Sequence, residues 1–419
     1  MIRNYLLVSL KVLMRKKFFT FVSLFGISFT LAVLMAGAAF LDHFTAPHPP
    51  ESQLDRTLYA KTTELKGERN HIISSLSWYI IENYMKRMET PEMISVTRRP
   101  VELPAFVGER KLMLSVRYTD TNFWAMRSFQ FVEGGPFTET DLENGNLTAV
   151  INQRTRDEYF GSSGVVGEWL EVDGIRYLVT GVVGNVPLTQ EESYADLWAP
   201  LSVARFDRKE VRFFGDFNVA ILARSTDDFP RIRDEWKGIL AQVDLSPSRH
   251  QAKEIWIPIM TRPEYVSTSM KMSLGLADHY EESNVFLFYL ALLGGMLLFM
   301  LLPTINLVNI NLSRIMERSS EIGVRKAFGA SRRFLVGQFV TENVVLTMIG
   351  GVLGLVFSWV LLRWVESSGL VPDADFSLNL RVFALSFLIC LFFGVFSGVY
   401  PAWRMSRLHP VDALRGGVS

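Results

Sequence analysis

The chain has 419 residues, of which 49% are hydrophobic, and its 43 Lys and Arg residues balance its 43 Asp and Glu residues at a net charge of zero. Disordered chains combine low hydrophobicity with high net charge, so this composition excludes a disordered protein. The single cysteine, Cys390, excludes an internal disulfide and any site built from paired thiolates, and the neutral total gives no general case for nucleic-acid binding.

Four long apolar stretches divide the chain and predict four transmembrane helices. Each contains an uncharged run of about 20 residues or more, the length that an α-helix needs to cross the roughly 30 Å hydrocarbon core of a bilayer. The predicted spans are residues 18–41, 283–313, 334–362 and 382–403. The first could instead be a cleaved signal peptide, but its apolar run is longer than the usual signal, which favours an anchored helix.

The distribution of charge predicts the orientation of these spans. Basic residues outnumber acidic ones in the N-terminal amphipathic segment 1–17, in the loop 314–333 and in the C-terminal segment 404–419. The positive-inside rule therefore places these three segments and both termini in the cytoplasm. The large segment 42–282 and the short loop 363–381 then lie on the other side of the membrane.

The segment 42–282 is long enough for one large domain or two small ones. Residues 54–122 and 215–262 alternate strand and helix patterns, whereas residues 123–201 are rich in strand patterns. We therefore predict an integral membrane α-helical protein with a large α+β extracytoplasmic domain, in which a β-rich part is inserted into an α/β part.

Local patterns predict individual elements of this domain. Asp173-Gly174 tolerates positive φ and predicts a two-residue hairpin turn between strands 169–172 and 175–183. The other predicted strands are 56–61, 111–118, 147–151, 218–224 and 255–260, and the predicted helices are 78–88, 153–160 and 229–243.

The sequence contains no catalytic motif. A P-loop needs a Gly-Lys dipeptide at the nucleotide phosphates, and the chain has none; it also lacks H-E-x-x-H and Gly-x-Ser-x-Gly motifs. We therefore expect no enzyme activity, no metal site and no cofactor in this chain. Glu342 is expected at the cytoplasmic edge of the third span, where the helix dipole favours a carboxylate, and a proton relay is the alternative role.

Glycines in two predicted spans are spaced for close helix packing. Gly350 and Gly354, with Gly351 beside them, and Gly394 with Gly398 place small residues four positions apart. This spacing lets two helices approach closely, either within one chain or between two chains. We favour packing within one bundle.

The loop between the second and third spans carries the most informative motif. Residues 321–330 read Glu-Ile-Gly-Val-Arg-Lys-Ala-Phe-Gly-Ala and predict a short cytoplasmic helix with Gly329 as its C-cap. Ser331 is the predicted N-cap of the helix that forms the third span. Taken alone, this segment could equally be a solvated connector.

The motif resembles the E-I-G-x-R-K-A-x-G-A signature of the MacB/FtsX-type ABC transporter permeases, a family that also includes the lipoprotein-releasing permeases. Residues 401–404 and 410–415 resemble the C-terminal ending of that family. Residues 131–137, 148–152 and 159–161 resemble landmarks of its periplasmic domain.

The resemblance implies a coupling helix that sits in a groove of an ATP-binding subunit. Its residues would be Glu321, Ile322, Gly323, Val324, Arg325, Lys326, Ala327, Phe328 and Gly329. MacB itself carries its ATPase on the same chain, whereas this sequence starts shortly before its first span and has no P-loop. We therefore expect a separate ABC ATPase subunit, which would bind ATP and Mg.

The resemblance also implies a location in the bacterial inner membrane, a periplasmic large domain and a dimer with a second copy or a sister permease. In this family the membrane helices are regarded as levers rather than as a channel. The implied function is export or extraction of a hydrophobic, peptide or lipoprotein substrate, with a periplasmic adaptor and an outer-membrane channel as further partners. An FtsX-like transmitter that activates a cell-wall hydrolase without transport is the alternative, and the size of the outer domain favours export.

Overall fold

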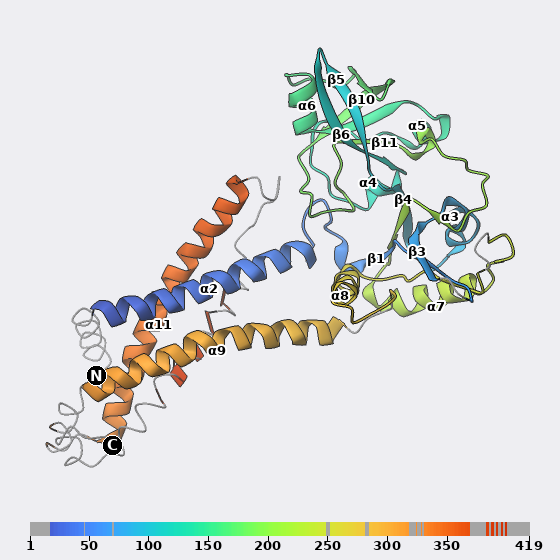
Figure 1. Ribbon diagram of the computed structural model, residues 1–419. Coiled ribbons are helices and arrows are strands. Elements are labelled where there is room, and N and C mark those ends of the chain that lie inside the picture. Colours follow the sequence, from blue (N-terminus) through green and yellow to red (C-terminus); the bar gives the residue numbers. More distant parts are fainter. Residues whose placement is uncertain are drawn as a thin grey trace. The chain divides into compact units, whose positions relative to one another are not determined.

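The computed structural model describes residues 17–45, 47–68, 71–248, 252–280, 285–317, 324, 328, 331–368 and scattered positions between 383 and 399. The chain divides into two compact units. The domain unit runs from His43 to Phe286, and the helix unit contains the long helices that precede and follow it in the chain (Figure 1).

Three long helices are described in the helix unit. They are α2 (Lys17–Thr45), α9 (Val285–Glu317) and α11 (Arg332–Ser367). Two segments, Thr20–Ala39 and Val336–Ser367, are long and apolar enough to cross a membrane, and Val285–Phe299 is a shorter apolar stretch. The described residues therefore do not confirm a count of four spans, and the fourth predicted span lies largely outside them.

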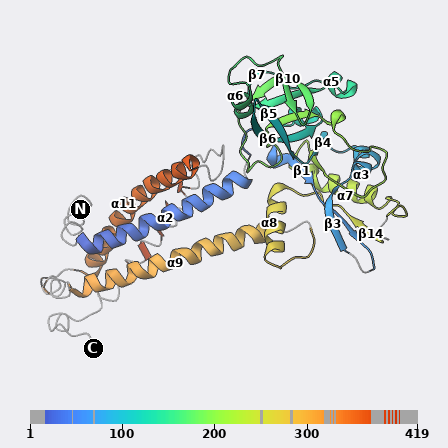
Figure 2. The ribbon, with the colours of Figure 1, turned by 45° about the horizontal axis from the view of Figure 1, so that its top comes forward.

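Helices α2 and α11 pack along a shared apolar seam. Ile27, Leu31 and Leu34 of α2 form one buried cluster with Val345 and Leu346 of α11. The two helices lie next to each other in both views (Figure 1 and Figure 2). Buried polar residues accompany the seam, namely Ser23, Ser28 and Thr30 on α2 and Gln338, Glu342, Asn343, Thr347 and Ser358 on α11.

Glu342 lies deeper in its helix than the sequence analysis expected. Helix α11 begins at Arg332, roughly three turns before Glu342, and the predicted N-cap is confirmed because the Ser331 hydroxyl accepts a hydrogen bond from the Phe334 N–H at 3.3 Å. The favourable effect of a helix dipole is confined to the first turn, so it does not reach Glu342. The Glu342 side chain is instead buried within the bundle.

The domain unit is built around a mixed sheet of 14 strands. The strands are β1 (Thr57–Ala60), β2 (Thr63–Lys66), β3 (His71–Leu76), β4 (Met93–Arg98), β5 (Val101–Val107), β6 (Arg110–Thr119), β7 (Phe131–Gly134), β8 (Thr148–Asn152), β9 (Trp169–Val172), β10 (Ile175–Val183), β11 (Leu197–Pro200), β12 (Phe214–Gly215), β13 (Phe217–Leu222) and β14 (Glu254–Trp256). The helices are α3 (Trp78–Asn83), α4 (Asn122–Ala125), α5 (Glu139–Asn144), α6 (Gln153–Tyr159), α7 (Phe229–Leu240) and α8 (Arg262–Ser273), with short 3-10 turns η1 (Leu54–Arg56), η2 (Met85–Arg87), η3 (Leu201–Val203) and η4 (Thr226–Asp228).

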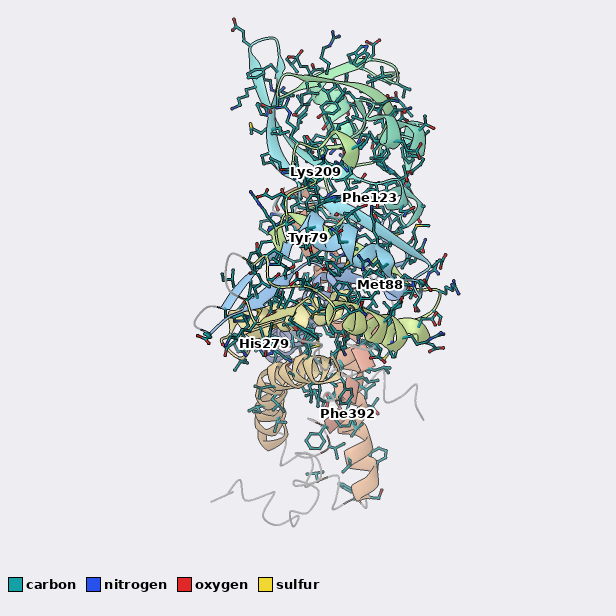
Figure 3. The ribbon with its side chains drawn as sticks, turned by 90° about the vertical axis from the view of Figure 1, so that its right-hand side faces the viewer. Tyr79, Met88, Phe123, Lys209, His279 and Phe392 are labelled. Atoms are coloured by element: carbon teal, nitrogen blue, oxygen red, sulfur yellow. The ribbon has the colours of Figure 1, made fainter. Side chains whose placement is uncertain are left out.

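Six of the strands close on themselves and form the β-rich part. The ring runs β6-β5-β9-β10-β8-β11, and β11 returns to pair in parallel with β6. Closure removes the free edges that an open sheet would expose. Side chains alternate across the ring wall: Ala149 and Ile151 join the main core, whereas Val150 joins an aromatic cluster with Phe123 and Trp198. Phe123 of this cluster is labelled in Figure 3.

The other strands form the α/β part. Beyond β6 the sheet continues through β4, β13, β3, β2 and β14, and β1 also pairs with β13. Helix α7 buries Ile232, Trp236 and Leu240, a spacing of four residues that is typical of an amphipathic helix. The indole N–H of Trp236 donates to the Ile257 carbonyl at 2.8 Å, which ties α7 to the chain after β14.

Most of the elements predicted for this unit are confirmed. The Asp173-Gly174 turn joins β9 and β10, with φ of 51° and 73° at its two residues. The predicted strands 56–61, 147–151 and 218–224 correspond to β1, β8 and β13, and the predicted helices 153–160 and 229–243 to α6 and α7. Helix 78–88 is α3 followed by η2, and strand 255–260 is shortened to β14.

Strand β6, predicted at 111–118, belongs to both parts of the domain. It pairs with β4 of the α/β part, and it also closes the ring through β5 and β11. The sequence patterns predict that residues 54–122 belong to the α/β part, whereas strand pairing joins β5 and β6 to the strands of 123–201.

Candidate functional site

Two exposed apolar residues lie in the segment of the chain that connects α9 to α11. Val324 is helical, and the Phe328 N–H donates to the Val324 carbonyl at 3.1 Å, the spacing of one helical turn. The side chains of Val324 and Phe328 are 46% and 88% exposed. The other predicted coupling residues lie outside the described residues, namely Glu321, Ile322, Gly323, Arg325, Lys326, Ala327 and Gly329.

The glycines of α11 lie against neighbouring side chains. A Cβ atom on Gly350 would lie 2.6 Å from Cγ2 of Ile27, and one on Gly351 would overlap the ring of Phe387. A larger residue at either position would therefore force its neighbour to shift. Gly394 and Gly398 lie outside the described residues.

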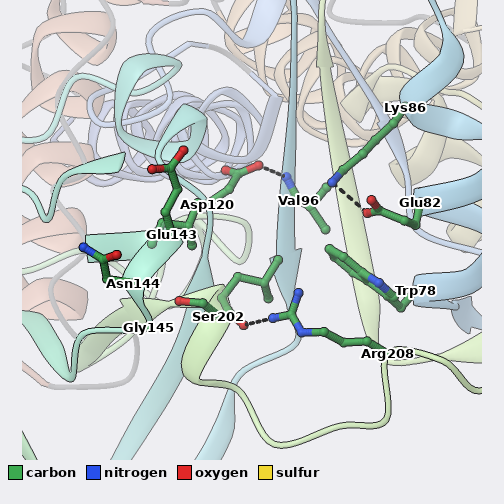
Figure 4. Close-up of a pocket in the computed structure, with 12 residues that line it drawn as sticks. Trp78, Glu82, Lys86, Val96, Asp120, Glu143, Asn144, Gly145, Ser202 and Arg208 are labelled. Carbon is green, nitrogen blue, oxygen red and sulfur yellow. Dashed lines mark hydrogen bonds and ion pairs between the residues drawn. The ribbon is translucent and has the colours of Figure 1, made fainter. Parts of the chain in front are cut away.

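A cavity of about 520 Å³ opens in the domain unit between α3, α5 and η3 (Figure 4). The ring of Trp78 forms one wall between two cations: Lys86 Nζ lies 5.0 Å and the Arg208 guanidinium carbon 5.2 Å from the ring centroid. Lys86 forms an ion pair with Glu82 at 2.7 Å, and Arg208 donates to the Leu201 carbonyl at 3.0 Å. These contacts hold both cations over the aromatic ring.

Asp120 contributes a carboxyl group to this cavity. Its Oδ1 accepts hydrogen bonds from the Ser95 hydroxyl at 2.8 Å and the Phe123 N–H at 3.0 Å, and its Oδ2 accepts from the Val96 N–H at 2.6 Å. Burial nevertheless raises the pKa of Asp120 to about 6, because the loss of hydration outweighs these three donors. The residues that line the cavity have the character of a binding site, and they include no nucleophile hydrogen-bonded to a base.

A second cavity, of about 700 Å³, lies at the β14 edge of the sheet. Its lining includes Glu64, His71 and Trp256. Glu64 accepts hydrogen bonds from His71 Nε2 at 3.1 Å and from the Tyr280 N–H at 2.6 Å, and the Trp256 indole donates to the Tyr280 carbonyl at 2.9 Å. Across the described residues, no group of three His, Cys, Asp or Glu side chains is placed to hold a metal ion.

No motif in the sequence marks the residues of either cavity. Trp78 was expected only as part of the predicted helix 78–88, and Asp120 belongs to no motif. The first cavity is lined from five separate stretches of chain, so no local spacing could indicate that they converge.

Two family matches cover most of the chain. Residues 20–239 match the MacB-like periplasmic core domain, and residues 293–410 match the FtsX-like permease C-terminal domain. The first match alone includes more than half of the sequence. The chain belongs to the MacB/FtsX-type family of ABC transporter permeases.

Several curated relatives are members of this permease family. The chain is 29% identical over 300 residues to the macrolide export ATP-binding/permease protein MacB of Bdellovibrio bacteriovorus, which covers 69% of this chain and 42% of that protein. It is 27% identical over 298 residues to the uncharacterized ABC transporter permease YvrN of Bacillus subtilis, covering 71% and 68%. It is 29% identical over 338 residues to the pyoverdine export ATP-binding/permease protein PvdT of Pseudomonas entomophila, covering 78% and 47%. The chain thus spans less than half of MacB and PvdT.

One solved structure similar to the permease is the periplasmic region of MacB from Actinobacillus actinomycetemcomitans. The similarity covers 54% of this chain and 94% of that chain, with 14% sequence identity and a TM-score of 0.36.

Proposed function

We propose that this permease transmits the motion of a separate ABC ATPase, which binds ATP and Mg, to its own domain unit. The observation that carries the proposal is the exposed pair Val324 and Phe328, placed between two long helices. Apolar side chains one helical turn apart suit insertion into a groove of a soluble partner. Because the same short segment links α9 to α11, a push on it would act on both helices.

In this proposal Val324 and Phe328 face the cytoplasm of a bacterial cell and the domain unit lies in the periplasm. Two observations support this orientation. Basic residues are in excess in segments 1–17, 314–333 and 404–419, and the domain matches the MacB-like periplasmic core domain. We further propose that the permease works as a dimer, with a second copy or a sister permease. A periplasmic adaptor and an outer-membrane channel would complete the export path.

We propose export or extraction of a hydrophobic, peptide or lipoprotein substrate rather than activation of a cell-wall hydrolase. The names of MacB and PvdT describe export of macrolides and of pyoverdine, and this supports a transport function. The substrate of this permease would engage the domain unit, not a channel through the helices.

Co-purification tests the coupling assignment. The full chain is purified from its native membrane in mild detergent, and an accompanying ABC ATPase is identified by mass spectrometry. We expect Phe328→Asp to lose this ATPase, because a charge replaces the side chain that enters the groove. Phe106→Asp is the matched control, since Phe106 is also exposed, at 59%, but lies on β5. Equal recovery of the ATPase with both variants would contradict the proposal.

A further inference from the structure

A buried polar cluster joins distant segments within the domain unit. We call Glu51, Arg127, Ser193 and Arg262 the clasp. The Ser193 hydroxyl donates to Glu51 Oε1 at 2.9 Å and accepts from Arg127 Nε at 3.1 Å. Arg262 forms an ion pair with Glu51 Oε2, and its Nη2 donates to the Thr189 carbonyl at 2.7 Å. All four clasp residues are less than 10% exposed.

The turn that carries Ser193 is also held from other sides. Arg117 of β6 donates from Nε to the Tyr194 carbonyl at 3.1 Å, and Lys61 Nζ pairs with Glu192 Oε1 at 2.5 Å. Burial alone would raise the pKa of Glu192, but the charges of Lys61 and Arg117 outweigh it and lower that pKa to about 2. Gln190 Nε2 donates to the Pro49 carbonyl at 3.1 Å, so the turn also holds the stretch before Glu51.

The clasp connects both ends of the domain unit to one turn of the ring. Glu51 lies a few residues after the end of α2, and Arg262 is the first residue of α8, the last helix before α9. Ser193 lies in the connection between β10 and β11, two strands of the closed ring. The two chain segments that lead to α2 and α9 therefore meet the β-rich part at the same buried contact.

We infer that the clasp is the mechanical link through which movement of α2 and α9 reaches the β-rich part. This inference rests on the proposed function. A buried, multiply hydrogen-bonded ion pair suits the task because neither partner can move away without leaving the other as an unpaired buried charge. Movement of Glu51 or Arg262 would thus displace the Ser193 turn and, with it, β10 and β11. The clasp residues are positioning residues and touch no substrate in this scheme.

Distance measurements in the full chain test the link. Cys390 is replaced by Ser, and spin labels are attached at Lys111 on β6 and Asp234 on α7, both of which are exposed. The chain is reconstituted in lipid nanodiscs with its ATPase, and the label distance is measured with and without a non-hydrolysable ATP analogue. We expect the analogue to shift the distance in the wild type.

The decisive variant is the double substitution Glu51→Gln with Arg262→Met. It removes the charges of both partners of the ion pair while keeping similar side-chain volumes, so that neither partner is left as a buried unpaired charge and the fold is kept. We expect this variant to hydrolyse ATP but to lose the distance shift. Glu264→Gln is the control: it breaks the 2.7 Å ion pair of α8 with Arg233 of α7, which does not involve the clasp. The control is expected to keep the shift.

The outcomes separate the two proposals. A shift in the double variant equal to that of the wild type would overturn the clasp and leave the proposed function standing, whereas no shift in the wild type would overturn both. If the double variant does not fold, Ser193→Ala takes its place, because it removes the hydroxyl between Arg127 and Glu51 but leaves the ion pair. A shift of wild-type size in Ser193→Ala would then overturn the inference.

Discussion

Leu31 of α2 occupies the space that Gly354 of α11 leaves open: a Cβ atom on Gly354 would lie 2.8 Å from the Leu31 Cβ. The Ser28 carbonyl would lie 3.1 Å away from the same Cβ, so the backbone of α2 itself is close. Gly350 makes the same kind of contact with Ile27 one turn earlier. The two helices can approach closely here because both positions lack a side chain.

We predict that Gly354→Leu destabilises the helix unit. The added side chain would overpack the seam at Leu31, which typically costs about 1–3 kcal/mol of unfolding free energy. Thermal unfolding of the full chain in detergent measures the effect. Gly337→Leu is the matched control on α11, because nothing lies within 4 Å of a Cβ at that position. Equal unfolding temperatures for the two variants would show that the seam tolerates a side chain at Gly354.

The sequence predicted local features well and long-range pairing poorly. Asp173-Gly174 and Ser331 were correct because a turn or a cap depends on a few adjacent residues. Closure of the ring depends on the pairing of Leu197 with Val116, which no local pattern encodes. Strand β5 was not predicted, since it contains Pro104, a residue that usually argues against a strand.

Helix α8 is an element that the sequence could have revealed. Thr261 and Glu264 form a capping box: the Glu264 N–H donates to the Thr261 hydroxyl at 3.4 Å, and the Thr261 N–H donates to Glu264 Oε2 at 2.6 Å. Thr-x-x-Glu with a proline between them is a known helix start. The clasp, by contrast, could not be predicted, because the sequence separates Glu51 from Arg262 by 211 positions.

We predict that Trp236→Ala destabilises the domain unit strongly. Trp236 is 2% exposed, and its indole donates to the Ile257 carbonyl, so the substitution leaves both a void and a carbonyl without its donor. Removal of a buried Trp side chain typically costs about 3–5 kcal/mol. Urea unfolding of the full chain, followed by circular dichroism, measures the loss. Trp169→Ala is the control, because Trp169 is 48% exposed, and a comparable loss there would mean that burial does not explain the effect.

We predict that the stability of the domain unit carries a pH dependence from Asp120. Burial raises the pKa of this carboxyl from 3.8 to about 6, so between these values the folded chain binds a proton that the unfolded chain has released. The stability contributed by protonated Asp120 is therefore complete below about pH 4 and is lost as the pH rises through 6. A shift of this size corresponds to about 3 kcal/mol of unfolding free energy.

Comparison of the wild type with Asp120→Asn isolates this contribution. The amide does not titrate, so the variant should lack this pH dependence between pH 4 and 7, although it also loses an acceptor for the Val96 N–H at every pH. The expected result is that the stability of the wild type relative to the variant falls by about 2 kcal/mol from pH 4 to pH 7. Unfolding midpoints of both proteins across this range provide the measurement, with the exposed carboxylate variant Asp234→Asn as the control for a general loss of charge. A difference between wild type and Asp120→Asn that stays constant with pH would mean that burial does not raise this pKa, and the cavity would then hold a permanently charged carboxylate beside Trp78 and its two cations.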